Sequence, residues 1–525
     1  ESKNLPSEEN YFRIPLQTNP PDLDPILLSD TTSDGVASKM FNTLIGYDED
    51  LNLVPELAVK MPEISEDGLE YTFELRRGVK FHNGREVKAD DVKFSLTRLA
   101  ETRSKRFNVI QPIAGAEAAQ QAARKNRPLE LSGVQVLGDY IVKIRLNKPY
   151  VPFIYLMTMT NAAVVPREEV EKKGYRFSRS PVGTGPFQFS EWKENNYLLL
   201  TRFDDYFEGK PKLAGIHYRV IPEPLARQEE YKAGKLDIVD FTLGMYEKWT
   251  QSDHADEVVL WPQATVQYYG FNLAKKGSPY AGYSEKAKKL RWAVNYAVDR
   301  EHICQNIYGG RHFPTNGIIP RGIPGNNESR PVFTKDIQKA KRLLAEAGYP
   351  DGQGLPEVEL FFNRQGDNDK VAQSVQDDLR KVGIPIRLKQ LDWGAYIQAA
   401  DAGEPAFFRL GWVADYPDPE NFLYFLFHSN NKGPQGNVTF YDQPEVDRLI
   451  DASYEETDRK KRLQLLGEAE ERIIQDVPWL FLTVQNEAVL LKPYIQKFRP
   501  TPMDDDVACA HVKWHQVEIT PAIQR

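Results

Sequence analysis

Cysteine and long apolar runs are the two features that this sequence most clearly lacks. Only Cys304 and Cys509 occur among its 525 residues, which excludes a small scaffold stapled by disulfides. Their spacing leaves open whether they form one disulfide or two buried thiols. Nowhere does the chain reach the roughly 18 consecutive apolar residues of a membrane-spanning helix. The sequence is therefore that of a globular protein.

An excess of positive charge is also missing. The 67 Lys and Arg residues face 75 Asp and Glu residues, which gives a net charge of −8 and a pI near 5.7. A surface that binds duplex nucleic acid needs a basic excess to displace counterions, so we expect no nucleic-acid partner. The length of 525 residues exceeds what one hydrophobic core supports, and we expect two or three domains.

The common catalytic motifs are absent, and we expect no enzyme. The chain contains no G-x-S-x-G, H-E-x-x-H, G-x-x-x-x-G-K-[ST] or C-x-x-C pattern. The segment GTGPF at 183–187 superficially resembles a phosphate loop. It lacks the third glycine, however, and Pro186 has no N–H to donate. A rigid turn is the better interpretation of this segment.

One segment near the C-terminus contains metal-ligating residue types. In a helix, His511 and His515 would share a face, and the thiolate of Cys509 would suit zinc or copper. The flanking valines favour a terminal strand over 507–517 instead, which separates the two histidines by about 13 Å along the chain. We therefore expect neither a metal nor a cofactor.

Hydrophobic periodicity outlines the secondary structure. An alternating segment at 68–81 predicts a half-buried strand, 131–148 predicts a hairpin, and Lys88 precedes a predicted helix. Strands at 358–363, 386–390 and 407–413 alternate with helices, which is typical of an open α/β layer. Helices are also predicted near 34–44 and at 284–306, 336–348, 369–383 and 459–475. No repeat or linker divides the chain, so its lobes should share crossing strands.

Several segments, taken in order, match the pattern of one family. The N-terminal matches are PDLDP at 21–25 and PELA at 55–58. The most diagnostic block is SEDGLEYTFELR at 65–76, FHNG at 81–84 and ADDV at 89–92. Further matches are VGTGPF at 182–187, KAGKLD at 232–237, RWAVNYAVDR at 291–300 and AKRLLAEAGY at 340–349. Together they resemble the family 5 extracellular solute-binding proteins of ABC importers, and the oligopeptide-binding members most.

The resemblance implies an α/β fold similar to type II periplasmic binding proteins. It has two main lobes joined by a hinge, plus an extra third domain. By analogy, lobe I combines 1–49, 180–267 and 493–525, the additional domain II is 50–179, and lobe III is 268–492. Chain crossings near 268–272 and 487–494 would form the hinge, and closure would use a few residues there. The implied function is to capture a short peptide between two lobes and deliver it to a membrane ABC permease.

The resemblance also implies a cellular location and an oligomeric state. Such proteins are periplasmic or extracellular, and we expect a monomer. The chain begins at Glu1 rather than at methionine, and no export signal follows. A mature form with its signal removed explains this start, and so does a shortened recombinant chain. Attachment to the membrane through a removed N-terminal segment is left open.

The segment 409–419, RLGWVADYPDP, supplies the main ligand candidates. In the family, the G-W-x-x-D pattern provides the carboxylate that holds a peptide's α-ammonium, and Asp415 occupies that position. Arg409 matches a position that binds the peptide's C-terminal carboxylate, which a planar guanidinium suits. In a strand, Arg409 and Gly411 face one way and Trp412 the other. A turn-bracing Asp415 and a structural salt bridge at Arg409 are the alternatives.

Other positions complete the expected site. The basic residue expected at either of two further positions is replaced by Asn368 and Ala400, with Arg364 nearby, so the peptide length is left open. The site is also expected to include aromatic walls and two hydroxyls, which are equally suited to the core: Phe107, Tyr268, Tyr269, Trp393, Trp412, Tyr416, Thr31 and Ser33. The alternative ligands are a nickel chelate, a haem, an opine or an oligosaccharide, with His428 as weak support for nickel.

Overall fold

The computed structural model describes residues 10–241, 245–363, 367–433 and 436–520. The chain forms two compact units. Unit 1 comprises Glu1–Thr242, Ser252–Leu260 and Ala488–Arg525, and unit 2 comprises Leu243–Gln251 and Trp261–Glu487. The long strands β12 (Val258–Phe271) and β17 (Trp479–Leu491) belong partly to each unit. The expected division into three lobes stays a prediction.

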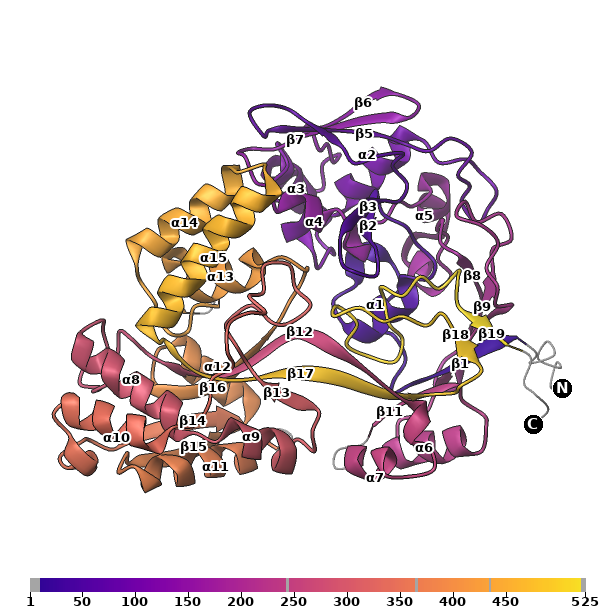
Figure 1. The fold of residues 1–525 in the computed structure, drawn as a ribbon. Helices are drawn as coiled ribbons and strands as arrows, with labels where there is room; N and C mark the ends of the chain where they lie inside the picture. The colour runs from indigo at the N-terminus through magenta and orange to yellow at the C-terminus, as the bar shows by residue number, and fades with distance from the viewer. Residues whose placement is uncertain (1–9, 242–244, 364–366, 434–435, 521–525) are drawn as a thin grey trace. The chain divides into compact units, whose positions relative to one another are not determined.

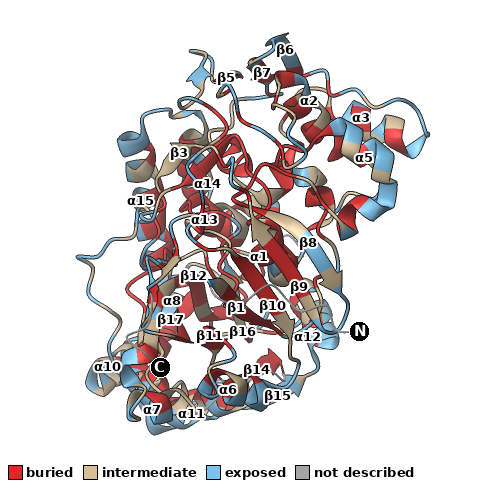
Figure 2. Ribbon diagram, turned by 90° about the vertical axis from the view of Figure 1, so that its right-hand side faces the viewer, coloured by how far each residue is buried: buried red, intermediate tan, exposed pale blue. Residues whose placement is uncertain are grey.

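A four-stranded sheet of unit 1 joins the N-terminus to distant segments. Its order is β1 (Tyr11–Leu16), β10 (Gly215–Val220), β9 (Tyr197–Arg202) and β8 (Phe187–Lys193). Strand β1 is parallel to β10, whereas the other pairs are antiparallel. Phe12, Ile14 and Tyr218 are fully buried, and Figure 2 shows β9 and β10 largely buried. Burial of such side chains contributes about 1.5–3 kcal/mol each and stabilises this long-range pairing.

A second sheet of unit 1 contains the predicted hairpin. Its order is β4 (Glu63–Ile64), β5 (Glu70–Glu74), β7 (Ile141–Arg145) and β6 (Val134–Gly138). The half-buried strand predicted at 68–81 is confirmed only as far as Glu74, where β5 ends. The pairs Tyr71↔Ile144 and Phe73↔Val142 lie on its buried face. The alternation seen in the sequence therefore marks the core side of this sheet.

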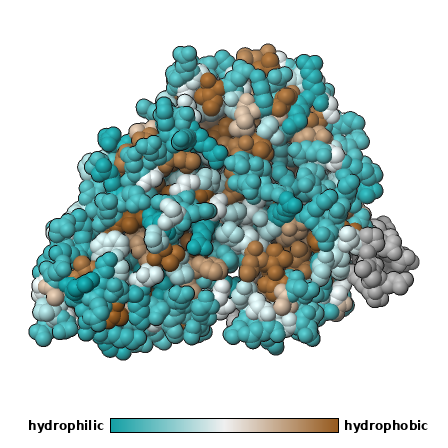
Figure 3. Space-filling model, viewed as in Figure 1, coloured by the Kyte–Doolittle hydropathy of each residue, from teal (hydrophilic) through white to brown (hydrophobic). Residues whose placement is uncertain are grey.

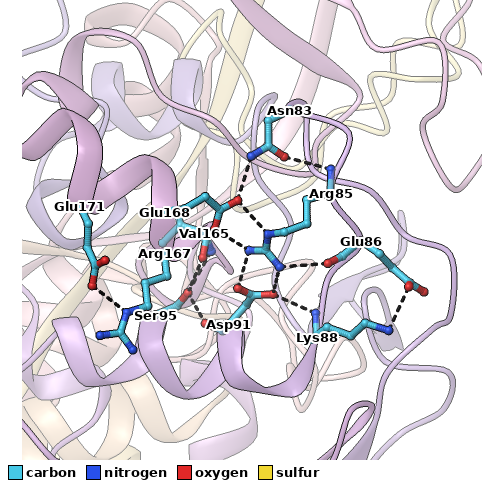
Figure 4. Close-up of polar contacts among 10 residues, drawn as sticks. All are labelled: Asn83, Arg85, Glu86, Lys88, Asp91, Ser95, Val165, Arg167, Glu168 and Glu171. Carbon is cyan, nitrogen blue, oxygen red and sulfur yellow. Dashed lines mark hydrogen bonds and ion pairs between the residues drawn. The ribbon is translucent and has the colours of Figure 1, made fainter.

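The diagnostic block of the resemblance has a structural role around Arg85. Arg85 donates two hydrogen bonds to Asp91, at 2.9 and 2.7 Å, and one from Nε to Glu168 at 2.7 Å (Figure 4). Asp91 also accepts a bond from the backbone N of Lys88, 2.9 Å away, at the start of α2 (Ala89–Arg98). Glu168 lies on α5 (Arg167–Lys173). One guanidinium thus joins two helices, and the helix predicted after Lys88 is confirmed.

Glycines at 183 and 185 allow two backbone segments to touch. A Cβ at Gly183 would lie 2.0 Å from Met40 O, and one at Gly185 would lie 2.5 Å from Lys39 O. Thr184 between them is buried and donates to Asn42 Oδ1 at 3.1 Å. The segment is therefore a packed turn, as the sequence indicated.

Unit 2 contains the predicted α/β layer. Its sheet runs β17, β12, β16 (Phe407–Val413), β14 (Val358–Asn363), β15 (Ile386–Leu391), and β13 (His312–Pro314) also pairs with β17 (Figure 1). Strand β11 (Ile238–Asp240) belongs to unit 1 and pairs with the end of β17 that lies in the same unit. Strand β14 is parallel to both β15 and β16. Helices α11 (Asn368–Lys381) and α12 (Trp393–Asp401) connect these strands. The three strands predicted between 358 and 413 are all confirmed.

The remaining elements are mostly short. In unit 1 they are β2 (Ile45–Tyr47), β3 (Leu53–Pro55), β18 (Ile495–Gln496), β19 (Glu518–Ile519), α1 (Thr31–Ala37), α3 (Ala116–Arg124), α4 (Phe153–Leu156) and α6 (Pro224–Lys232). In unit 2 they are α7 (Tyr246–Thr250), α8 (Glu285–Ala297), α9 (Arg300–His302), α10 (Ile337–Glu346), α13 (Glu420–Phe427), α14 (Pro444–Glu455) and α15 (Arg459–Asp476). On the face drawn in Figure 3 most of the surface is hydrophilic, and hydrophobic side chains form separate patches. No helix in the described ranges is long and apolar enough to cross a membrane.

Two predicted helices have different bounds in the structure. The helix expected near 34–44 is α1, which begins earlier because Asp30 accepts a hydrogen bond from Ser33 N at 2.8 Å. The helix expected at 284–306 is broken after α8, since Val298 is extended and the side chain of Asp299 caps α9. A π-turn, Ile303–Ile307, follows.

The expected strand over 507–517 is wrong. The segment forms turns, because the buried ammonium of Lys39 takes the carbonyls of Ala508 and Cys509, which a strand would use for pairing. Both cysteines are buried and neither forms a disulfide, and the Cys509 thiol donates to Asp506 O at 3.0 Å. Within the described residues, no three His, Cys, Asp or Glu side chains are grouped to hold a metal.

Candidate ligand-binding site

Strand pairing in unit 2 places Arg409 beside two polar side chains of β12. In the antiparallel register Tyr269 is opposite Arg409, and Gln267 is opposite Gly411. Residues two apart on a strand share a face, so Arg409, Gln267 and Tyr269 lie on one face and Trp412 on the other. The predicted alternation of Arg409 and Trp412 is confirmed.

Among the described residues, Arg409 donates hydrogen bonds to neutral groups. Its Nη2 donates to Gln267 Oε1, and its Nη1 lies 3.5 Å from Asn363 Oδ1. No carboxylate within the described ranges forms an ion pair with this half-buried guanidinium, so the structural salt bridge considered from the sequence is absent there. A planar cation with neutral neighbours is suited to receive an anionic group.

The phenol of Tyr269 adds a second donor on the same face. Tyr269 is 1% exposed, and its hydroxyl has no hydrogen-bond partner among the described residues. Burial raises the pKa of Tyr269 above its ordinary value, which keeps the phenol protonated and able to donate. The hydroxyl of Tyr396, on α12, donates to the backbone O of Arg409 and so ties this strand to the helix.

His312 lies near this cation and is uncharged. Burial lowers the pKa of His312 to about 3, and the charges of Arg311 and Arg409 add to that shift. Its ring stacks on Tyr308, with ring centroids 3.6 Å apart, and its Nδ1 lies 3.2 Å from Thr483 Oγ1. The positive charge at this end of the site therefore comes from the arginines.

Asp415 lies in the turn that follows β16. Its side chain is exposed, and its backbone N donates to Asn421 Oδ1 at 3.2 Å. The indole of Trp412 donates to the same oxygen at 2.9 Å and stacks on Phe425, with centroids 5.7 Å apart. The carboxylate of Asp415 thus extends from a backbone that Asn421 fixes. Its predicted contact with an ammonium group stays a prediction.

The remaining candidates lie in both units. In unit 2, Tyr416 is buried and donates to Glu420 Oε2 at 2.6 Å, while Tyr268 is buried and stacks on Trp479, with centroids 3.7 Å apart. Trp393 is 52% exposed at the start of α12. Three candidates belong to unit 1: Thr31 is exposed, Ser33 is buried and Phe107 is half-buried. Their contacts with a ligand stay predictions.

The altered positions are internal to unit 2 or outside the described residues. Asn368 is buried and donates to Asn363 Oδ1 at 3.0 Å, and Ala400 is buried in α12. Arg364 lies outside the described residues. Sequence reasoning missed Gln267, Asn363 and Asn421. The spacing of two residues between Gln267 and Tyr269, which places them on one face of a strand, was a usable signal, whereas nothing local marks the two asparagines.

Comparison with known proteins identifies the family. The model of "Bacterial extracellular solute-binding proteins, family 5 Middle" matches residues 52–434. The glutathione-binding protein GsiB of Salmonella choleraesuis is 30% identical over 473 residues, which cover 88% of this chain and 86% of that protein. The oligopeptide-binding protein OppA of Bacillus subtilis is 29% identical over 494 residues, or 91% and 88% of the two chains.

A solved structure agrees with this result. HbpA2 of Haemophilus parasuis superposes with a TM-score of 0.83 at 26% identity, covering 98% of this chain and 100% of that one. The fold is therefore that of the multidomain type II periplasmic binding proteins, as the resemblance implied. This chain belongs to family 5 of the bacterial extracellular solute-binding proteins.

Proposed function

We propose that this chain binds a short peptide outside the cytoplasm and delivers it unchanged to an ABC importer in the membrane. The observation that carries the proposal is the guanidinium of Arg409, which has amide oxygens of Gln267 and Asn363 as neighbours and no carboxylate within the described residues. A partly desolvated charge without a counterion is costly. A ligand carboxylate removes that cost and fits the planar fork of the side chain.

Asp415 supports a ligand with an ammonium group as well. Its carboxylate is exposed on a turn whose backbone is fixed, so it can pair with a cation without prior rearrangement. A solute with one carboxylate and one ammonium group is the chemistry of a free peptide. An uncharged sugar offers no carboxylate to the half-buried guanidinium of Arg409 and no ammonium group to Asp415.

The relatives support the same class of ligand. GsiB and OppA carry the names of a glutathione-binding and an oligopeptide-binding protein, and both kinds of ligand are small and zwitterionic. We include the aromatic and hydroxyl candidates in the proposal, each as a contact for peptide side chains or backbone. They are Thr31, Ser33, Phe107, Tyr268, Tyr269, Trp393, Trp412 and Tyr416.

A non-peptide solute is the alternative. The histidine that gave weak support for a nickel chelate, His428, is buried, with its Nε2 3.3 Å from Asp451 Oδ1. That position favours a structural role for the ring. A haem or an opine also carries carboxylates and would engage Arg409, but a haem has no ammonium group for Asp415.

Native mass spectrometry of the purified protein tests the proposal directly. A ladder of co-purified masses that dissociates as peptides is the expected result, together with calorimetric binding of trialanine. One sharp non-peptide mass, with no heat on adding trialanine, would overturn the peptide assignment. A metal adduct would favour a nickel chelate as the ligand instead.

A further inference from the structure

Asn421 makes two hydrogen bonds to the residues that the proposed function places at the ligand. It is the second residue of α13 and is fully buried. Its Oδ1 accepts from Trp412 Nε1 at 2.9 Å and from Asp415 N at 3.2 Å. A single side-chain oxygen therefore connects the indole, the carboxylate-bearing turn and the helix.

The other half of the same amide has no partner. Asn421 Nδ2 is buried without a hydrogen bond among the described residues. A buried donor without a partner destabilises the folded state, and an apolar side chain of similar volume would avoid that cost. Asn421 thus contributes to the structure through its oxygen, which accepts hydrogen bonds from Trp412 and from the backbone of Asp415.

The start of α13 is firmly anchored, so Asn421 has a fixed base. Asp418 accepts two bonds from Arg462, at 2.6 and 2.8 Å, and both side chains are buried. Asp418 Oδ1 also accepts from Glu420 N at 3.0 Å. Pro417 and Pro419 restrict the backbone on either side of Asp418. Asn421 therefore follows directly on a backbone that these contacts hold in place.

We infer that Asn421 is a positioning residue for the recognition of the ligand's ammonium group. Through Oδ1 it fixes the backbone at Asp415 and the ring at Trp412, and it does not itself touch the ligand. The inference rests on the proposed function, in which Asp415 pairs with the ammonium group. Attraction between charges falls with distance, so a carboxylate on a loosened turn binds the cation less well.

A double-mutant cycle tests the inference, with trialanine and N-acetyl-trialanine as probes in calorimetry. The ratio of their dissociation constants measures recognition of the ammonium group. We expect the wild-type ratio to be about tenfold or more, and Asn421→Ala to reduce it to about threefold or less. In the Asp415→Asn background, Asn421→Ala should leave the ratio unchanged, because Asn421 acts on the ammonium group through Asp415, whereas a loss through Trp412 weakens both probes alike.

A matched variant separates positioning from general loss of stability. Asn437 is also a buried asparagine of unit 2, and its Oδ1 accepts from Tyr441 N and Thr439 Oγ1, both at 3.0 Å. Its Nδ2 donates to the backbone O of His428 and of Tyr441, and its hydrogen bonds within the described ranges involve neither Asp415 nor Trp412. Asn437→Ala should lower the melting temperature and leave the ratio unchanged. An equal fall of the ratio in both variants would overturn the inference.

The inference can still be tested if Asn421→Ala does not fold, and other results would contradict it. If Asn421→Ala does not fold, Trp412→Phe removes one of the two donors to Asn421 and should reduce the ratio by a smaller factor. A ratio that stays at its wild-type value in Asn421→Ala, or in Trp412→Phe if that variant is used, contradicts the positioning role. A wild-type protein that does not prefer the free amine contradicts the proposed function, and the inference falls with it.

Discussion

Arg462 and Arg409 belong to the same unit, and they differ in what faces their guanidinium groups. Arg462 is buried and donates two hydrogen bonds to the buried carboxylate of Asp418. Arg409 is half-buried and donates to amide oxygens of Gln267 and Asn363. In the first pair, a carboxylate inside the protein neutralises the charge of the guanidinium. In the proposed function, a ligand carboxylate supplies the anion that Arg409 lacks among the described residues, and this difference distinguishes a structural arginine from a candidate ligand-binding one.

The largest expected effect comes from breaking the ion pair of Arg462 and Asp418. Arg462→Met leaves Asp418 buried without its cation, and we expect a loss of about 3–5 kcal/mol in the free energy of unfolding. Urea denaturation measures this loss. The double variant Arg462→Met/Asp418→Leu should recover much of it, because no charge is then left without a partner. Equal instability of the single and double variants would contradict this account.

The same kind of change at Arg409 should affect binding instead of stability. Arg409→Gln removes the cation that the ligand carboxylate pairs with, and we expect roughly a 30-fold or larger loss of trialanine affinity. The melting temperature without ligand should stay the same or rise, since a charge without a counterion has been removed. Calorimetry and thermal unfolding measure both. Unchanged affinity would remove Arg409 from the site.

Asp415 should show a smaller effect, because its carboxylate is exposed and solvent weakens its charge interactions. We expect Asp415→Ala to weaken trialanine binding by about tenfold or more with nearly unchanged thermal stability. Added salt should reduce the difference between wild type and variant. An affinity for trialanine equal to that of the wild type would exclude the ammonium contact.

The smallest expected effect, taken per pH unit, is on the pH dependence of stability near the Arg462–Asp418 pair. Burial, with the charge of Asp418, raises the pKa of Glu420 to about 7, although Tyr416, Tyr454 and Arg462 oppose the shift. The folded state therefore holds a proton that the unfolded state has lost. Stability should fall as pH rises from the ordinary glutamate pKa to about 7, by at most about 1.4 kcal/mol per pH unit.

A matched variant isolates this titration. Glu420→Gln should flatten the slope between the same two pH values, as followed by urea denaturation at a series of pH values. A slope identical to that of the wild-type protein would assign the pH dependence to other groups.

Local patterns were enough to predict much of the fold. The α/β layer of unit 2 followed from apolar strands and from helices ended by glycines, and Gly348 and Gly383 do adopt the left-handed conformation. The break after α8 and the turns at 507–517 were missed. Both depend on distant partners, since Lys39 bonds to carbonyls about 470 residues away.

The site was predictable only where strand alternation or the family pattern applied. Alternation separated Arg409 from Trp412 correctly. The neighbours of Arg409 could not be predicted, because Gln267 is 142 residues away in the chain and is brought close by strand register. Asn421 is close in sequence to Asp415, but its role depends on the direction of α13, which no residue pattern gives.

The absence of a side chain at Gly411 has a consequence for redesign of the site. A Cβ there would lie 2.8 Å from Gln267 Oε1 and 2.9 Å from its Nε2. Even an alanine would push Gln267 away from Arg409, and the guanidinium would lose the neutral acceptor that orients it. A residue without a side chain thus affects the direction of the cation. Selectivity could be retuned from this backbone position while both charged residues stay unchanged.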